Sequence, residues 1–189
     1  ITSGFQWLDG SFLEQIDSLE GLSLVNTRIG DAGALARLAP LRRLFINGVR
    51  ADAGFDFLAK LAQVEELHLL NLRGALSLPN FVTMAALRTF RVWGCKGFAD
   101  ASVLEGVPQL EEVELVDVGL EPDQLEAIVA KPSVRYVAAR FGTVARNARF
   151  DEILAEQHAD LARLGEVEQG GEQGEGGGRL LTAGLGHGQ

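Results

Sequence analysis

The chain of 189 residues is 47% hydrophobic and carries 17 Lys and Arg against 26 Asp and Glu, which gives a formal net charge of −9. This length suffices for one domain with a full core, and the absence of a run of 18 apolar residues argues against a membrane span. The acidic balance argues against nucleic acid, because phosphate recognition depends on clustered Lys and Arg. A protein partner with a basic or neutral surface fits better.

A short apolar pattern recurs six times at spacings of 22 to 24 residues. Each copy has an apolar residue, two variable residues, an apolar residue, one variable residue and another apolar residue. The copies begin at Leu19, Leu41, Val64, Leu87, Leu110 and Val134. All eighteen frame positions are apolar, far more than a 47% hydrophobic composition gives by chance.

The period and the frame resemble the leucine-rich repeat family over roughly residues 1–142. This resemblance implies an α/β fold: a right-handed solenoid with a parallel concave β-sheet and helical or irregular convex limbs. The family usually places Asn or Cys eight residues after the first frame position, and only Cys95 matches here. The preceding column is rich in turn formers, so the turn is predicted one residue earlier. That column reads Asn26, Gly48, Asn71, Gly94, Asp117 and Phe141.

At the start of the chain, counting back from Leu19 places Ile1 at the third apolar position of an earlier repeat. The solenoid is therefore predicted over residues 1–146 with a truncated first repeat. Solenoids need a polar cap at each end, so we expect the chain to be a fragment of a longer protein. Proteolytic maturation and a strand supplied by a partner are the alternatives.

Between the predicted strands, pairs of apolar residues recur three positions apart, the spacing of one inward helical face. These pairs are Leu35 and Leu38, Leu58 and Leu61, Phe81 and Met84, and Leu104 and Val107. Residues 52–62 and 121–131 are predicted to be helices, the second with Pro122 in its first turn. Residues 75–86 contain Pro79 and are predicted to be shorter or irregular.

After the sixth repeat, residues 147–164 form a predicted amphipathic helix. Its apolar face carries Phe150, Ile153, Leu154, His158 and Leu161. A helix in this place is expected to cap the core and the open sheet edge; the alternative is a partner-binding helix. Residues 165–189 are rich in Gly, Glu and Gln, a composition typical of a disordered tail.

The variable strand positions are predicted to point onto the concave face, away from the core. Strands lie about 4.8 Å apart, so Leu70, Trp93 and Val116 would form one apolar ridge. Arginine and aromatic anchors with a polar rim are typical of an interaction hot spot. The candidate protein-binding residues are Arg43, Phe45, His68, Leu70, Arg91, Trp93, Glu114, Val116, Tyr136 and Arg140. The alternative is that another domain or the tail covers this ridge.

The sequence predicts no enzyme, no cofactor and no metal site. His68, His158 and His187 fall on a strand, a helix and the tail, without metal-ligand spacing. The single cysteine, Cys95, is expected to pack in the core. Carboxylates on an open sheet lack the difference in burial that would separate their pKa values for acid and base roles, and this applies to Glu66, Glu112 and Glu114.

The resemblance implies a non-catalytic protein-interaction module that binds a partner on its concave face. Two other functions stay open: the recognition arm of a larger enzyme whose catalytic domain lies before Ile1, and a small inhibitor or immunity-type protein that blocks a basic toxin through its acidic surface. The sequence has no Asn-x-Ser/Thr sequon, which favours a cytoplasmic location. Abundant Arg, Ala and Gly favour a bacterial source. The oligomeric state is not indicated.

Overall fold

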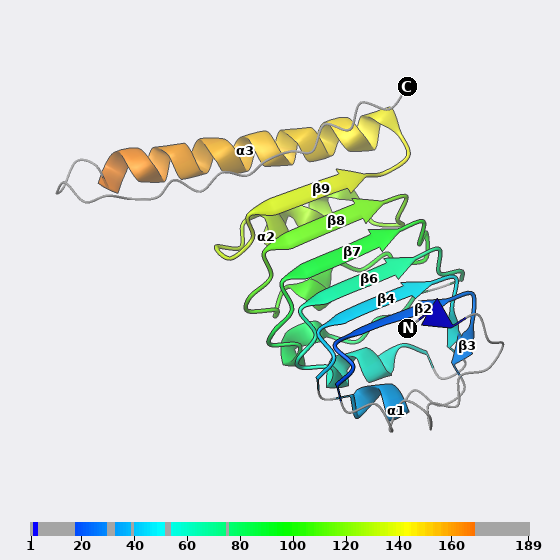
Figure 1. Cartoon of the computed structure of the whole chain (residues 1–189). Helices are drawn as coiled ribbons and strands as arrows, with labels where there is room; N and C mark the ends of the chain where they lie inside the picture. The colour runs from blue at the N-terminus through cyan, green and yellow to red at the C-terminus, as the bar shows by residue number, and fades with distance from the viewer. Residues whose placement is uncertain are drawn as a thin grey trace.

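A computed structural model describes residues 2–3, 18–29, 33–38, 40–51, 54–74 and 76–168. One seven-stranded parallel sheet runs through these residues in the order β1-β2-β4-β6-β7-β8-β9, as Figure 1 shows. Every neighbouring pair in it is parallel. The strands are β1 (Thr2–Ser3), β2 (Gly21–Val25), β4 (Arg43–Asn47), β6 (Glu66–Leu70), β7 (Thr89–Trp93), β8 (Glu112–Val116) and β9 (Tyr136–Arg140). A second, two-stranded sheet pairs β3 (Arg28–Ile29) with β5 (Arg50–Ala51).

The core lies between this sheet and the return limbs. All eighteen predicted frame positions are buried, none more than 8% exposed. The four predicted limb pairs, from Leu35 and Leu38 to Leu104 and Val107, are buried as well. Each large apolar side chain buried in this way stabilises the fold by roughly 1.5–3 kcal/mol. The structure therefore confirms the fold class: an α/β leucine-rich-repeat solenoid.

The return limbs are helical segments of unequal length, which confirms the predictions of a shorter or irregular limb over residues 75–86 and of a helix over 121–131. They are α1 (Gly33–Ala36), η2 (Asp56–Lys60), η3 (Phe81–Thr83), η4 (Ser102–Leu104) and η5 (Pro122–Leu125) followed by α2 (Glu126–Val129). The prediction of a long helix over 52–62 is wrong, because η2 is a short 3₁₀ helix. Backbone hydrogen bonds from Leu58 to Phe55 and from Leu61 to Leu58 place these three buried side chains on one edge.

The turns that end the strands confirm the predicted one-residue shift. Backbone φ is positive at Asn26, Gly48, Asn71, Gly94 and Asp117, a conformation that Asn, Asp and Gly tolerate best. In the sixth repeat the positive φ falls one residue later, on Gly142, and Phe141 is buried. The first five turn residues each donate a backbone N–H to the last strand residue of the next repeat, at 2.8–2.9 Å. These bonds fix the stacking of successive repeats.

Cys95 occupies the family position that was expected to bond the turn backbone. It is fully buried, and its Sγ accepts the backbone N–H of Leu72 at 3.3 Å. Four other residues of that column, Thr27, Val49, Leu72 and Val118, are also buried, whereas the sixth, Gly142, is exposed. Cys95 is therefore a packing residue that also satisfies a backbone donor.

The first strand differs in register from the prediction. In the pairing of β1 with β2, Ser3 lies opposite Leu24, the third frame position, and Thr2 lies opposite Ser23. The prediction placed Ile1, and not Ser3, opposite the third frame position. The connection from β1 to β2 is thus two residues shorter than the 23-residue repeat assumed by counting back from Leu19.

A helix, α3 (Val144–Glu168), follows β9 and covers the end of the solenoid (Figure 1). Phe150, Ile153 and Leu154 are buried, and the Phe150 ring packs edge-on against Phe141 at 5.8 Å. His158, predicted on the apolar face, is exposed. The tail was predicted to begin at residue 165, but α3 continues to Glu168, so the prediction is wrong for residues 165–168. The side chain of Leu161 and the rest of the predicted tail, from residue 169, lie outside the described residues.

Ion pairs attach the start of α3 to the last return limb. Arg149 bonds Asp123 at 2.7 Å and Glu126 at 3.1 Å, and Arg146 bonds Glu121 at 2.7 Å. Asn147 accepts the backbone N–H of Phe141 at 2.8 Å, which fixes the connection from β9. None of the helices in the described ranges is long and apolar enough to cross a membrane.

Candidate protein-interaction face

The strand register places the ten predicted residues on one face of the sheet, in three rows that run across the strands. The row at the start of the strands is Gly21, Arg43, Glu66, Thr89, Glu112 and Tyr136; the middle row is Ser23, Phe45, His68, Arg91, Glu114 and Ala138; the last row is Val25, Asn47, Leu70, Trp93, Val116 and Arg140. We call these eighteen residues the concave face. All are half-buried or exposed, whereas the frame positions between them are buried.

The last row contains the predicted apolar ridge. Leu70 pairs with Trp93, and Trp93 pairs with Val116, so the three side chains lie on adjacent strands. Trp93 is 41% exposed. The other large hydrophobic residues exposed in the described part of the chain, Val82 and Val144, lie outside this face. Trp93 is thus the prominent apolar side chain of the concave face.

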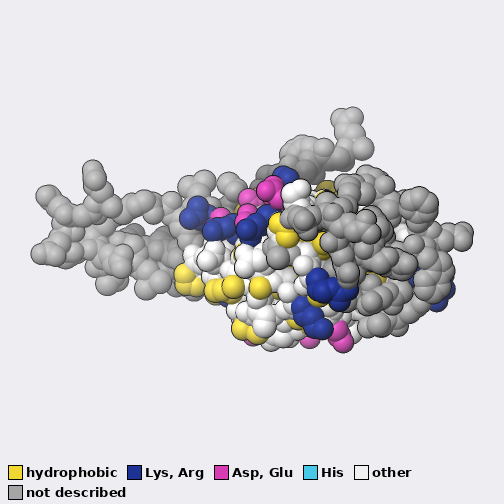
Figure 2. Space-filling view, turned by 60° about the horizontal axis from the view of Figure 1, so that its bottom comes forward, with side chains coloured by type: hydrophobic (Ala, Val, Ile, Leu, Met, Phe, Trp, Pro, Cys, Tyr) yellow, Lys and Arg dark blue, Asp and Glu magenta, His cyan; other side chains and the backbone are white. Residues whose placement is uncertain are grey.

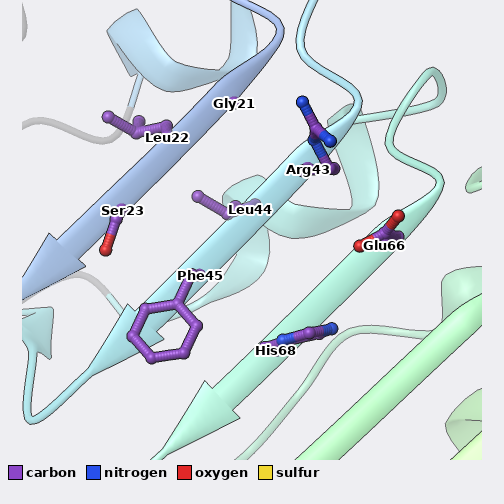
Figure 3. Close-up of a pocket in the computed structure, with 8 residues that line it drawn as sticks. All are labelled: Gly21, Leu22, Ser23, Arg43, Leu44, Phe45, Glu66 and His68. Carbon is purple, nitrogen blue, oxygen red and sulfur yellow. The ribbon is translucent and has the colours of Figure 1, made fainter. Parts of the chain in front are cut away.

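Phe45 lies apart from this ridge, in the middle row. Its ring packs edge-on against His68 with centroids 6.2 Å apart. The pair lines a hollow of about 260 Å³ at the N-terminal end of the face, together with Gly21, Ser23 and Arg43 (Figure 3). The hollow forms because the β2 side chains in these rows are small. Because the hollow results from small side chains and not from functional groups, the sequence alone did not indicate it.

Arg91 is held by two carboxylates of the neighbouring strand. Its Nε lies 3.2 Å from Glu114, and its Nη2 lies 3.4 Å from Glu112. The face as a whole holds three arginines, Arg43, Arg91 and Arg140, and three glutamates, Glu66, Glu112 and Glu114. Its formal charges therefore balance, although the chain carries −9.

His68 is a neutral member of the face near pH 7. Its Nε2 is buried and has no hydrogen-bond partner among the described residues. Burial lowers the pKa of His68, the positive charge of Arg91 lowers it further, and Glu66 opposes the shift. His68 therefore contributes an aromatic surface against Phe45 and carries no charge at neutral pH.

Metal ligands and the cysteine were searched for among the residues that the structure describes. They contain no group of three or more His, Cys, Asp or Glu side chains placed to hold a metal ion. Burial raises the pKa of Cys95, and the hydrogen bond from Leu72 opposes the shift. A buried thiol with a raised pKa is a poor nucleophile, because the thiolate is the reactive form.

The sequence reading overlooked a charge ladder at the edge where the strands begin. The second position of the frame alternates strictly between acid and base: Glu20, Arg42, Glu65, Arg88, Glu111 and Arg135. Arg42 pairs with Glu65 at 3.8 Å, and Arg88 pairs with Glu111. In Figure 2, one group of Lys and Arg side chains is likewise interleaved with Asp and Glu. Reading this column of the sequence would have revealed the ladder.

No protein-family model matches the sequence, and no curated protein matches it at a significant level. Solved structures that match include an internalin from Listeria monocytogenes, with 19% sequence identity and a TM-score of 0.42. The match covers 68% of this chain and 38% of the internalin chain. The fold assignment therefore depends on the geometry of this chain and not on its similarity to the internalin. A buried apolar frame in each of six repeats and one five-residue parallel strand per repeat make this chain a leucine-rich-repeat protein by fold.

Proposed function

We propose that the protein is a non-catalytic recognition module that binds a partner protein on its concave face. The observation that carries this proposal is the position of Trp93, 41% exposed between Leu70 and Val116 in the last row of the concave face. A contiguous apolar patch on a folded protein usually marks a contact surface. Tryptophan surrounded by polar and arginine side chains is the composition typical of binding hot spots.

The shape of the face favours a protein over a small molecule. Six strands at about 4.8 Å spacing give an open surface roughly 24 Å wide, whereas small molecules usually bind in enclosed clefts. Because three arginines balance three glutamates on it, the face favours a partner patch that is neutral overall. The net charge of the chain favours a basic partner, but the balanced charges of the concave face do not.

The test is a Trp93→Ala variant, used first to identify and then to measure the partner. Proteins captured from the native source by the wild type and lost with the variant are the candidates. Their affinity, measured by calorimetry, should fall by about 2 kcal/mol, or about 30-fold, if Trp93 is a hot spot.

Val82→Ala is the matched control, because Val82 is 55% exposed and lies on the η3 limb, away from the concave face. This variant should retain every partner. If folded Trp93→Ala binds each captured protein as tightly as the wild type does, the concave-face site is wrong.

A further inference from the structure

A second recess lies at the carboxyl ends of β2, β4 and β6, beside the concave face. It has a volume of about 580 Å³, and its polar lining comes from Asn26, Asn47, Asn71, Arg50 and Arg73. No Asp or Glu among the described residues lines it. Asn47 is also in the last row of the concave face, so the recess is continuous with that surface.

The arginines of this recess belong to a basic column. The tenth position of the frame is Arg28, Arg50, Arg73 and Lys96 in four successive repeats, and Arg28 pairs with Arg50 across β3 and β5. Lys96 lies 3.6 Å from Asp117, so its charge has a partner within the chain. Of this column, Arg50 and Arg73 line the recess.

Arg50 and Arg73 have no carboxylate partner among the described residues, which they share with Arg43, Arg135 and Arg140, but of these arginines only Arg50 and Arg73 line this recess. Arg42, Arg88 and Arg91 are each held by a carboxylate of the next strand. The exposed side chains of Arg50 and Arg73 make no ion pair and no hydrogen bond with any described residue. Two unpaired guanidinium groups on adjacent repeats are suited to an anion, because the planar fork binds a carboxylate or phosphate through two parallel hydrogen bonds.

The asparagines distinguish between these two anions. Asn71 Nδ2 donates to Asn47 Oδ1 at 2.9 Å, which orders both amides. Each amide carries acceptors as well as donors, so the recess can pair with both the N–H and the C=O of a peptide. A phosphate presents almost only acceptors at neutral pH and would leave the amide oxygens unused.

We propose that this recess binds an acidic segment of a polypeptide, with a carboxylate on Arg50 and Arg73 and its backbone on the asparagine amides. The inference deepens the proposed function, because it adds an acidic peptide site at the rim of the face that binds the partner. It does not depend on Trp93, so the two sites can succeed or fail separately.

The test uses a blocked pentaglutamate peptide, titrated into the full chain by calorimetry and by NMR, with inorganic phosphate as a second ligand. The peptide should bind saturably, and Arg50→Gln and Arg73→Gln should each weaken it about tenfold, the loss of one charge-assisted bidentate contact. Arg73→Lys should recover only part of the affinity, because lysine keeps the charge and loses the fork.

Arg135→Gln is the matched control, since it removes the same charge from an exposed arginine at the opposite edge of the sheet. It should leave peptide binding unchanged, as should Trp93→Ala. Circular dichroism checks that each variant is folded. The proposal is overturned if the peptide does not saturate, if Arg135→Gln weakens it as much as Arg73→Gln, or if phosphate binds and the peptide does not.

Discussion

Residues at the turns show why Asn or Asp alternates with Gly along the solenoid. A Cβ on Gly48 would lie 2.4 Å from Oδ1 of Asn26, and one on Gly94 would lie 2.8 Å from Oδ1 of Asn71. The side chain of the turn residue in one repeat thus occupies the space that a side chain in the next repeat would need. The acid and base ladder alternates with the same two-repeat period.

Substituting Gly94 by Ala tests this alternation. The new Cβ has to displace the Asn71 amide, which breaks its 2.9 Å bond to Asn47, and a non-glycine residue at φ 64° is strained in addition. We expect a loss of about 2–3 kcal/mol in the free energy of unfolding, the sum of the left-handed penalty and one hydrogen bond. Chemical denaturation measures it.

The matched control for this change is Gly74→Ala. Gly74 also has a positive φ, yet a Cβ there would meet nothing within 4 Å. Gly74→Ala should lower the free energy of unfolding only by the penalty for a left-handed backbone, about 1–2 kcal/mol. Equal losses at Gly94 and Gly74 would show that the Asn71 side chain does not determine the residue that follows it in the next repeat.

The burial and backbone conformation of individual residues were predicted correctly where the repeated pattern determines them. The eighteen frame positions and the shifted turns follow from periodicity, since the same local geometry recurs in every repeat. The partners of Arg91 did not follow, because Glu112 and Glu114 lie on the next strand and both reach it only in the actual rotamers. The recess of Arg50 and Arg73 did not follow either, because periodicity does not indicate which exposed side chains beyond the strands enclose a hollow.

At the level of elements, α3 closes the end that a stack of repeats leaves open. The last strand, β9, has no strand on its outer side in the described part of the sheet. Phe150, Ile153 and Leu154 cover the core there, and Arg146 and Arg149 attach the helix to η5 and α2. Because each repeat contacts mainly its neighbours, loss of this cover should be felt first in the last repeat.

Phe150→Ala should therefore destabilise the C-terminal end. Phe150 is buried and packs on Phe141, and truncation of a buried phenylalanine typically costs about 3–5 kcal/mol. Hydrogen exchange should show the amides of β9 losing protection before those of β4. Val144→Ala, at a site 87% exposed in the same helix, should change neither quantity. Uniform loss of protection along the sheet would contradict a local capping role.

Elements were harder to predict where length and register depend on packing. Leu58 and Leu61 gave the correct inward spacing, but a spacing of three fits a 3₁₀ turn as well as an α-helix. The register of β1 was wrong by two residues, because counting back assumed a constant repeat length. The start of α3 and its apolar face through Leu154 were within reach of the sequence, since Phe150, Ile153 and Leu154 have helical spacing.

At the scale of the whole molecule, the net charge and the charge of the concave face differ. The chain carries −9, yet the face holds as many arginines as glutamates, and Arg91 is neutralised locally by Glu112 and Glu114. The affinity of an inhibitor that blocks a basic toxin through its acidic surface would depend on the net charge of the whole chain. A module that binds through Leu70, Trp93 and Val116 would depend on apolar contact.

Ionic strength separates these two modes of binding. Between about 50 mM and 500 mM NaCl the Debye length falls from roughly 14 Å to 4 Å, which screens exposed charges and leaves apolar burial intact. We expect the affinity of a partner that requires Trp93 to change by less than about threefold. The concave face has no net charge, so salt has no net attraction to screen there. The same titration with pentaglutamate, which should depend on Arg50 and Arg73, is expected to weaken by about tenfold or more. A partner that requires Trp93 and still dissociates steeply with salt would mean that the charge of the whole chain, and not the ridge, supplies its affinity.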